Sequence, residues 1–252
     1  MHSILRRTPD IATETYTESH MGRGADYDES FEEFRIRANL WEMEQEVLHD
    51  LVPRTRAASV LDVACGTGRI TEVVARELPA ARLLGIDAAE SMLAQARGRV
   101  PGAQFECVDL RQLHETVPAG SIDLATAFRF FPNADPALRT AGVDAISAAV
   151  RPGGFVLLNN HRNFWSPSYI LRRARRGAVA PGALNRDMLD PFKARGFSVM
   201  ARRSLAVLPH SETETYAVPE RWAERFERVN LRRLSARHSA GTDTIWLLQK
   251  RA

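Results

Sequence analysis

Short apolar runs alternate with amphipathic segments through the middle of the chain, and this alternation constrains the fold more than any other feature of the sequence. The apolar runs predict strands at residues 59–64, 82–86, 103–108, 121–127 and 155–159. The segments between them predict helices at residues 71–78, 89–99 and 136–150. Because strands that alternate with helices pair in parallel beneath helices on both faces, we predict an α/β fold with a doubly wound, Rossmann-like, mostly parallel sheet.

The regions on either side of this core have other patterns. Residues 1–28 are polar without an apolar period, which predicts a flexible N-terminal tail. A helical pattern starts at Ser30, and we expect it to end before Pro53. After Asn160 the alternation stops, and the later strand and helix patterns are at residues 196–207, 219–234 and 242–249.

These patterns predict one domain over residues 29–252, with a lid insertion at about 161–190 and a helical insertion at about 211–240. The first insertion is long, polar and rich in arginine. We expect the tail and the lid insertion to close together over a site, because long irregular segments in compact domains are often functional.

Composition excludes several classes of protein. The 252 residues contain no run of eighteen apolar residues, so we expect no membrane span, and residues 1–10 have no apolar core after Arg6 and Arg7, so we expect no secretory signal. Cys65 and Cys107 do not form a disulfide framework or a metal cluster, so we expect no metal and a reducing, cytoplasmic location. The net charge of +3 is weak evidence for a nucleic-acid partner.

A glycine-containing loop follows the first strand, in the stretch V-L-D-V-A-C-G-T-G-R from Val60 to Arg69. Such a loop lets the backbone approach a nucleotide at the start of a helix. A dinucleotide motif requires a third glycine where this chain has Thr71, and no Gly-Lys-Ser/Thr follows for a P-loop. Asp87 ends the second strand, 21 residues after Gly66, where a carboxylate accepts hydrogen bonds from ribose hydroxyls.

The order of these motifs resembles that of the class I S-adenosylmethionine-dependent methyltransferases. The stretches that carry the resemblance are V-L-D-V-A-C-G-T-G-R, L-L-G-I-D-A-A-E-S-M-L-A-Q-A-R, F-E-C-V-D-L, S-I-D-L-A-T-A-F and V-R-P-G-G-F-V-L-L, in order across residues 51–160. One departure is Ala64, which replaces the family's first loop glycine. The resemblance implies a seven-stranded sheet whose last strand is antiparallel, and S-adenosylmethionine as the cofactor.

By the same resemblance, the cofactor would lie across the carboxyl ends of the strands. Asp87 would hold the ribose, Asp109 and Leu110 the adenine, and the Asp62 side of the loop the methionine end. The cofactor-binding residues expected in full are Asp62, Ala64, Cys65, Gly66, Gly68, Asp87, Ala88, Met92, Asp109, Leu110, Ala127 and Phe128.

The acceptor side carries weaker signals. His161 follows the fifth strand, and its imidazole, with an ordinary pKa of about 6.5, is the candidate general base. The other interpretation is that His161 only orders the lid. The segment from Ala127 to Asp135 is rich in phenylalanine, which indicates an apolar or aromatic acceptor or a core position. Arg172, Arg175 and Arg176 could clamp an anionic acceptor or simply face solvent.

The sequence therefore predicts methyl transfer to a small-molecule acceptor through an oxygen, nitrogen or carbon nucleophile, for example on a specialised metabolite, quinone or lipid-like compound. An RNA or protein methyltransferase and a non-catalytic binding protein of the same fold are the alternatives. A nicotinamide dehydrogenase is disfavoured by Thr71. The oligomeric state is not fixed by the sequence, and a homodimer stays open.

Overall fold

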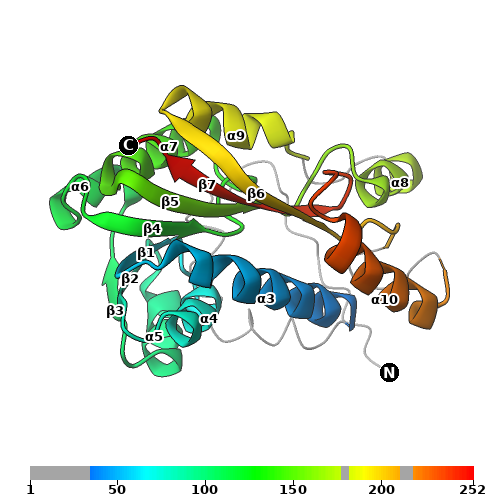
Figure 1. Ribbon diagram of the computed structural model, residues 1–252, viewed down its shortest axis with the longest axis horizontal. Coiled ribbons are helices and arrows are strands. Elements are labelled where there is room, and N and C mark those ends of the chain that lie inside the picture. Colours follow the sequence, from blue (N-terminus) through cyan, green and yellow to red (C-terminus); the bar gives the residue numbers. More distant parts are fainter. Residues whose placement is uncertain (1–34, 177–181, 211–217) are drawn as a thin grey trace, which may run out of the picture.

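The computed structural model describes residues 35–176, 182–210 and 218–252 (Figure 1). The predicted N-terminal tail, residues 1–28, lies outside the described residues, as do residues 177–181 of the predicted lid insertion and 211–217 of the predicted helical insertion. Among the described residues, no helix is long and apolar enough to cross a membrane.

One sheet of seven strands forms the centre of the structure, in the order β3-β2-β1-β4-β5-β7-β6. The strands are β1 (Ser59–Val63), β2 (Arg82–Asp87), β3 (Gln104–Cys107), β4 (Ile122–Ala127), β5 (Val150–Asn160), β6 (Phe197–Leu205) and β7 (Asp243–Lys250). Pairing is parallel from β3 through β5, and β7 is antiparallel to both β5 and β6. The doubly wound, mostly parallel sheet predicted from the alternation is thus confirmed, including its antiparallel last strand.

Helices cover both faces of this sheet, with α3, α4 and α5 on one side and α6, α7 and α9 on the other (Figure 1). Their bounds are α3 (Arg35–Thr55), α4 (Arg69–Glu77), α5 (Glu90–Arg99), α6 (Leu113–Thr116), α7 (Pro136–Ala149), α8 (Pro167–Arg176), α9 (Asn185–Ala194) and α10 (Glu220–Val229). A 3₁₀ turn (Leu110–Gln112) precedes α6, and a π-helical turn (Asn230–Leu234) continues α10. Each helix layer packs an apolar face onto the sheet, because buried aliphatic side chains supply most of the stabilisation.

Two predicted boundaries were wrong, for local reasons. Helix α3 continues through Pro53 to Thr55, because a proline in the last turn removes few backbone hydrogen bonds. Strand β5 begins at Val150 and not at Phe155. Residues 151–154 extend the strand, with a register shift between β4 and β5 and with Gly153 at φ 75°. The predicted lid insertion, expected to be irregular, contains α8 and the start of α9.

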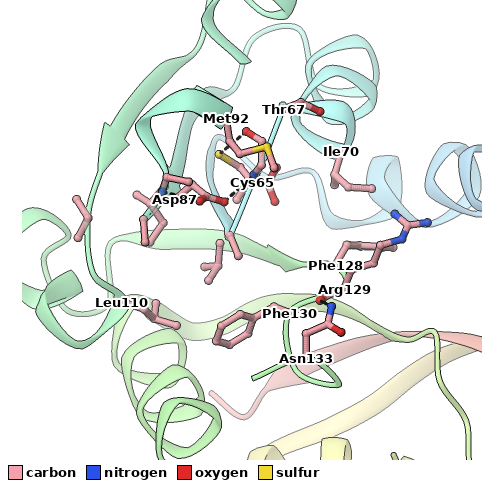
Figure 2. Close-up of a pocket in the computed structure, with 18 of the residues that line it drawn as sticks. Cys65, Thr67, Ile70, Asp87, Met92, Leu110, Phe128, Arg129, Phe130 and Asn133 are labelled. Carbon is pink, nitrogen blue, oxygen red and sulfur yellow. Dashed lines mark hydrogen bonds between the residues drawn. The ribbon is translucent and has the colours of Figure 1, made fainter. Parts of the chain in front are cut away.

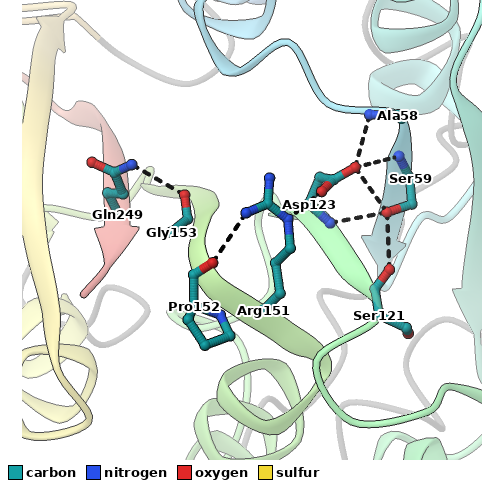
Figure 3. A network of polar contacts seen from close by, with 8 residues as sticks. All are labelled: Ala58, Ser59, Ser121, Asp123, Arg151, Pro152, Gly153 and Gln249. Carbon is teal, nitrogen blue, oxygen red and sulfur yellow. Dashed lines mark hydrogen bonds and ion pairs between the residues drawn. The ribbon is translucent and has the colours of Figure 1, made fainter. Parts of the chain in front are cut away.

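A polar network ties the amino ends of the parallel strands together (Figure 3). The Asp123 carboxylate on β4 accepts hydrogen bonds from the backbone amides of Ala58 and Ser59, at 2.8 and 2.9 Å, and from Arg151 on β5. Burial opposes ionisation of Asp123, but these donors outweigh it and lower its pKa to about 2. The network fixes the end of the sheet opposite to the carboxyl ends, where the site lies.

Candidate cofactor and acceptor pocket

A pocket opens at the carboxyl ends of the parallel strands, as expected for ligand sites in open α/β sheets (Figure 2). Figure 2 shows Cys65, Asp87 and Met92 gathered at one side and Phe128, Arg129 and Asn133 at another. The predicted residues that line the pocket are Asp62, Ala64, Cys65, Gly66, Asp87, Ala88, Met92, Asp109, Leu110 and Phe128. Lining residues that sequence reasoning did not assign to the cofactor include Thr67, Arg69, Ile70, Val108, Arg111, Arg129, Phe130, Asn133 and Leu138.

The loop after β1 turns through three residues in the left-handed region, namely Ala64 (φ 53°), Gly66 (φ 55°) and Gly68 (φ 79°). Ala64 thus keeps the conformation that suits a glycine, at some cost in strain. A Cβ built on Gly66 would meet no protein atom within 4 Å, so the loop leaves open space at this point.

Gly68 does not line the pocket, although we expected it to bind the cofactor. A Cβ at Gly68 would lie 3.0 Å from the Cβ of Ala96 on α5. Gly68 also immediately precedes α4, whose first residue is Arg69. The missing side chain of this glycine therefore serves the close packing of the start of α4 against α5.

Asp62 is buried at the end of β1 and is held by two hydroxyl groups. Thr71 and Thr126 donate hydrogen bonds to its two carboxylate oxygens at 2.5 and 2.7 Å. Burial raises the pKa of Asp62 to about 6, against the opposing effect of these hydrogen bonds. Thr71 stands where a dinucleotide motif has its third glycine. Its hydroxyl group binds Asp62, which lines the pocket.

Asp87 links the loop to the end of β2. Its Oδ2 accepts a hydrogen bond from the Gly66 amide and its Oδ1 accepts one from the Ala89 amide, both at 2.9 Å. The carboxylate therefore fixes the glycine loop while it lines the pocket. Asp109, at the end of β3, accepts hydrogen bonds from the backbone and the guanidinium of Arg111 and is partly exposed.

Two further predicted residues, Ala127 and His161, do not line the pocket. Ala127 is fully buried in the sheet, and its neighbour Phe128 reaches the pocket instead. The Nδ1 atom of His161 is buried without a hydrogen-bond partner. Burial, together with Arg162 and Arg129, lowers the pKa of His161 well below its usual value, so this imidazole stays neutral.

The described side chains of the arginine cluster do not form the expected clamp at this pocket. Arg172 and Arg175 lie on α8 and do not line it, and the side chain of Arg176 is outside what the structure describes. Across the described residues, no cluster of three or more His, Cys, Asp and Glu side chains is arranged to hold a metal ion.

Arg129, from the segment after β4, does line the pocket. Its guanidinium pairs with Glu44 of α3, with Nη2 2.7 and 2.6 Å from the two carboxylate oxygens. Glu44 was missed by sequence reasoning. The available signal was its helical spacing from the buried Val47, Leu48 and Leu51, which places an acid on the apolar face of α3.

Comparison with known proteins gives consistent matches. A family model described as a methyltransferase domain matches residues 60–154. The trans-aconitate 2-methyltransferase of Methylobacterium nodulans is 31% identical over 153 residues, which cover 61% of this chain and 53% of that protein. The protein of the same name from Variovorax paradoxus is 35% identical over 133 residues, or 52% of this chain and 49% of that protein. The chain thus spans about half the length of the curated relatives it matches.

Solved structures share the fold at low sequence identity. A methyltransferase from Thermotoga maritima has a TM-score of 0.64 at 16% identity, covering 91% of this chain and 97% of that one. An N-methyltransferase from Bradyrhizobium japonicum, solved with S-adenosyl-L-homocysteine, has a TM-score of 0.52 at 18% identity, covering 83% and 88%.

The strand order, the loop after β1 and these matches together show the fold of class I methyltransferases, and the pocket described above lies at the carboxyl edge of its sheet. The family-model match over residues 60–154 and the shared fold support a class I S-adenosylmethionine-dependent methyltransferase, as the order of the motifs predicted, with S-adenosylmethionine as the cofactor.

Proposed function

We propose that the protein transfers a methyl group from S-adenosylmethionine to a small-molecule acceptor, and that this acceptor is a carboxylic acid. The observation that carries the proposal is one pocket that combines the cofactor motif with Arg129, a positively charged side chain, beside Phe128 and Phe130. The relatives named above act, by name, on trans-aconitate, which is a tricarboxylic acid. An arginine beside an apolar surface suits an unsaturated acid, because guanidinium recognises carboxylates well.

The residues around the loop fit the cofactor. The open space at Gly66 gives a ligand access to the backbone, and Asp87 offers carboxylate oxygens to ribose hydroxyls. Asp109 and Leu110 would contact the adenine, and the side chain of Met92 would pack beside the nucleoside. Asp62 would provide a negative charge at the methionine end. When bound, the cofactor supplies an electrophilic methyl group on a sulfonium.

A carboxylic acceptor also removes the need for a general base. The carboxylate is already ionised at neutral pH, so the chain only has to bind it, orient one oxygen and exclude water. This agrees with a pocket that His161 does not line. A closing role for the lid insertion remains part of the proposal, with α8 as its described helix.

Turnover with methyl-labelled cofactor tests the proposal directly. We expect label in a base-labile methyl ester when the protein is incubated with trans-aconitate or related di- and tricarboxylic acids. Asp87→Ala serves as the control, because it should weaken cofactor binding and lower the amount of label. Label in a base-stable N-methyl or C-methyl product, or label only in RNA or protein, would contradict the carboxylic acceptor. Binding of NAD without binding of S-adenosyl-L-homocysteine would contradict the whole assignment.

A further inference from the structure

Arg129 lies in a strained conformation that is fixed at both ends of the residue. Its φ of 56° is in the left-handed region, which a residue with a side chain adopts only when its surroundings require it. Its backbone amide donates to Oδ1 of Asn159 at 2.7 Å, and its guanidinium pairs with Glu44. Strand β5 and helix α3 therefore hold the main chain and the side chain of the same pocket residue.

A second layer of buried groups supports these two partners. Nδ2 of Asn159 donates to both carboxylate oxygens of Asp243 on β7, at 3.2 and 3.0 Å. This contact orients the amide so that its oxygen points to Arg129. Glu44, Asn159 and Asp243 are all buried, with exposures of 1%, 0% and 5%, and none of them lines the pocket.

The cluster of Glu44, Asp243 and Arg129 has no net charge when one of its two carboxyl groups keeps a proton. Two buried carboxylates face one guanidinium, and an unbalanced buried charge is costly. Burial, followed by the negative charge of Glu44 and a hydrogen bond with it, raises the pKa of Asp243 well above its usual value, against the opposing effect of Arg129. Neutral Asp243 can then donate to Glu44 while Glu44 pairs with Arg129. His161 also feels the charge of Arg129, and burial together with Arg162 and Arg129 keeps its imidazole neutral.

We propose that Glu44 and Asp243 are positioning residues for the acceptor half of the pocket, and that together with Asn159 they present Arg129 as the anion-recognition group. This inference rests on the proposed function, because it assumes that the acceptor carries a carboxylate. It assigns α3 and β7, two elements outside the cofactor motif, a role in acceptor specificity. The proton shared between the two carboxylates makes that role dependent on pH.

Kinetics of three variants test the assignment, with the acid that wild type methylates as the acceptor. Glu44→Gln should raise the KM for the acceptor at least tenfold while the affinity for S-adenosyl-L-homocysteine stays within twofold. Glu46→Gln, an exposed position on the same helix, is the matched control and should behave as wild type. Asp243→Ala should also raise the acceptor KM, and Asp243→Asn, which mimics the neutral acid, should restore most of it.

The pH profile separates positioning from a merely structural role. In wild type, acceptor kcat/KM should fall as the pH rises through the raised pKa of Asp243 and this carboxyl loses its proton. The Asp243→Asn profile should lack that ionisation. Unchanged acceptor KM in folded Glu44→Gln, or identical profiles for wild type and Asp243→Asn, would overturn the proposal.

A measurement without acceptor keeps the two proposals distinguishable. The amide resonance of Arg129 should titrate with pH in wild type and not in Asp243→Asn. If wild type methylates no acid but this titration is observed, the proposed function fails and the positioning cluster stands. If the resonance does not titrate in wild type, the cluster does not work as described, whatever the acceptor.

Discussion

Replacement of Asp62 by asparagine should stabilise the protein at neutral and alkaline pH when no cofactor is bound. A rise of the pKa of this carboxyl from its usual 3.8 to about 6 means that its ionised form is disfavoured in the folded state. The corresponding free energy is about 3 kcal/mol, since a tenfold change in an ionisation constant is about 1.4 kcal/mol. Asparagine removes the charge and can keep both threonine contacts, because a hydroxyl either donates or accepts.

The pH dependence of this effect has a defined direction. Between pH 3.8 and about 6 the folded protein binds more protons at Asp62 than the unfolded chain does, so wild-type stability falls as pH rises through this range. Asp62→Asn lacks this loss. The difference in free energy of unfolding between the variant and wild type should therefore be small near pH 4, grow through pH 6 and level off above pH 7.

Urea unfolding of both proteins at a series of pH values, without cofactor, measures this difference. Asp123→Asn is the matched control, because its expected change in the free energy of unfolding has the opposite sign. The pKa of Asp123 is lowered to about 2 by Arg151 and two backbone amides, so its loss should destabilise the protein at neutral pH. If Asp62→Asn is no more stable than wild type at pH 8, or if its advantage does not change with pH, the burial argument is wrong.

Three further predictions concern the pocket and the loop after β1. Asp87→Ala should weaken S-adenosyl-L-homocysteine binding by about 1.5–3 kcal/mol in calorimetry, because ribose hydroxyls lose a charged acceptor, and an unchanged affinity in the folded variant would place the ribose elsewhere. Gly68→Ala should lower the free energy of unfolding by about 1–3 kcal/mol, because Gly68 has a positive φ and an added Cβ would press against Ala96. A variant as stable as wild type would refute that packing role. Cofactor affinity should fall as pH drops through about 6 in wild type and not in Asp62→Asn, and parallel profiles would remove Asp62 from the methionine end.

The cofactor half of the pocket was predictable because its signals are local. The carboxyl ends of parallel strands lie at one edge of the sheet. An acid at the end of each of three successive strands therefore lies at that edge, as does the loop after the first strand. Asp62, Asp87 and Asp109 therefore line one pocket, as the motif order predicted. The exception is Gly68, whose spacing in the motif does not reveal that Ala96 lies against it.

The acceptor half was less predictable because its contacts join distant segments. Arg129 and Glu44 are 85 residues apart, and Asn159 and Asp243 are 84 apart. The sequence predicted a strand here but not the face on which each of its last residues lies. Asn159 contacts the Arg129 amide, whereas Asn160 contacts Asn185 at the start of α9. No local pattern distinguishes these two neighbours.

Backbone strain connects the two halves. Among the described residues, four non-glycine residues have a positive φ, and two of them, Ala64 and Arg129, line the pocket. Each costs about 1–3 kcal/mol and persists only where its neighbours hold it. The residue after Ala64 is bonded through its amide to Ile86 of β2, and Arg129 is held by β5 and α3. The pocket is thus lined by two strained residues that the sheet and α3 hold in place, and under the proposed function cofactor and acceptor would meet between them.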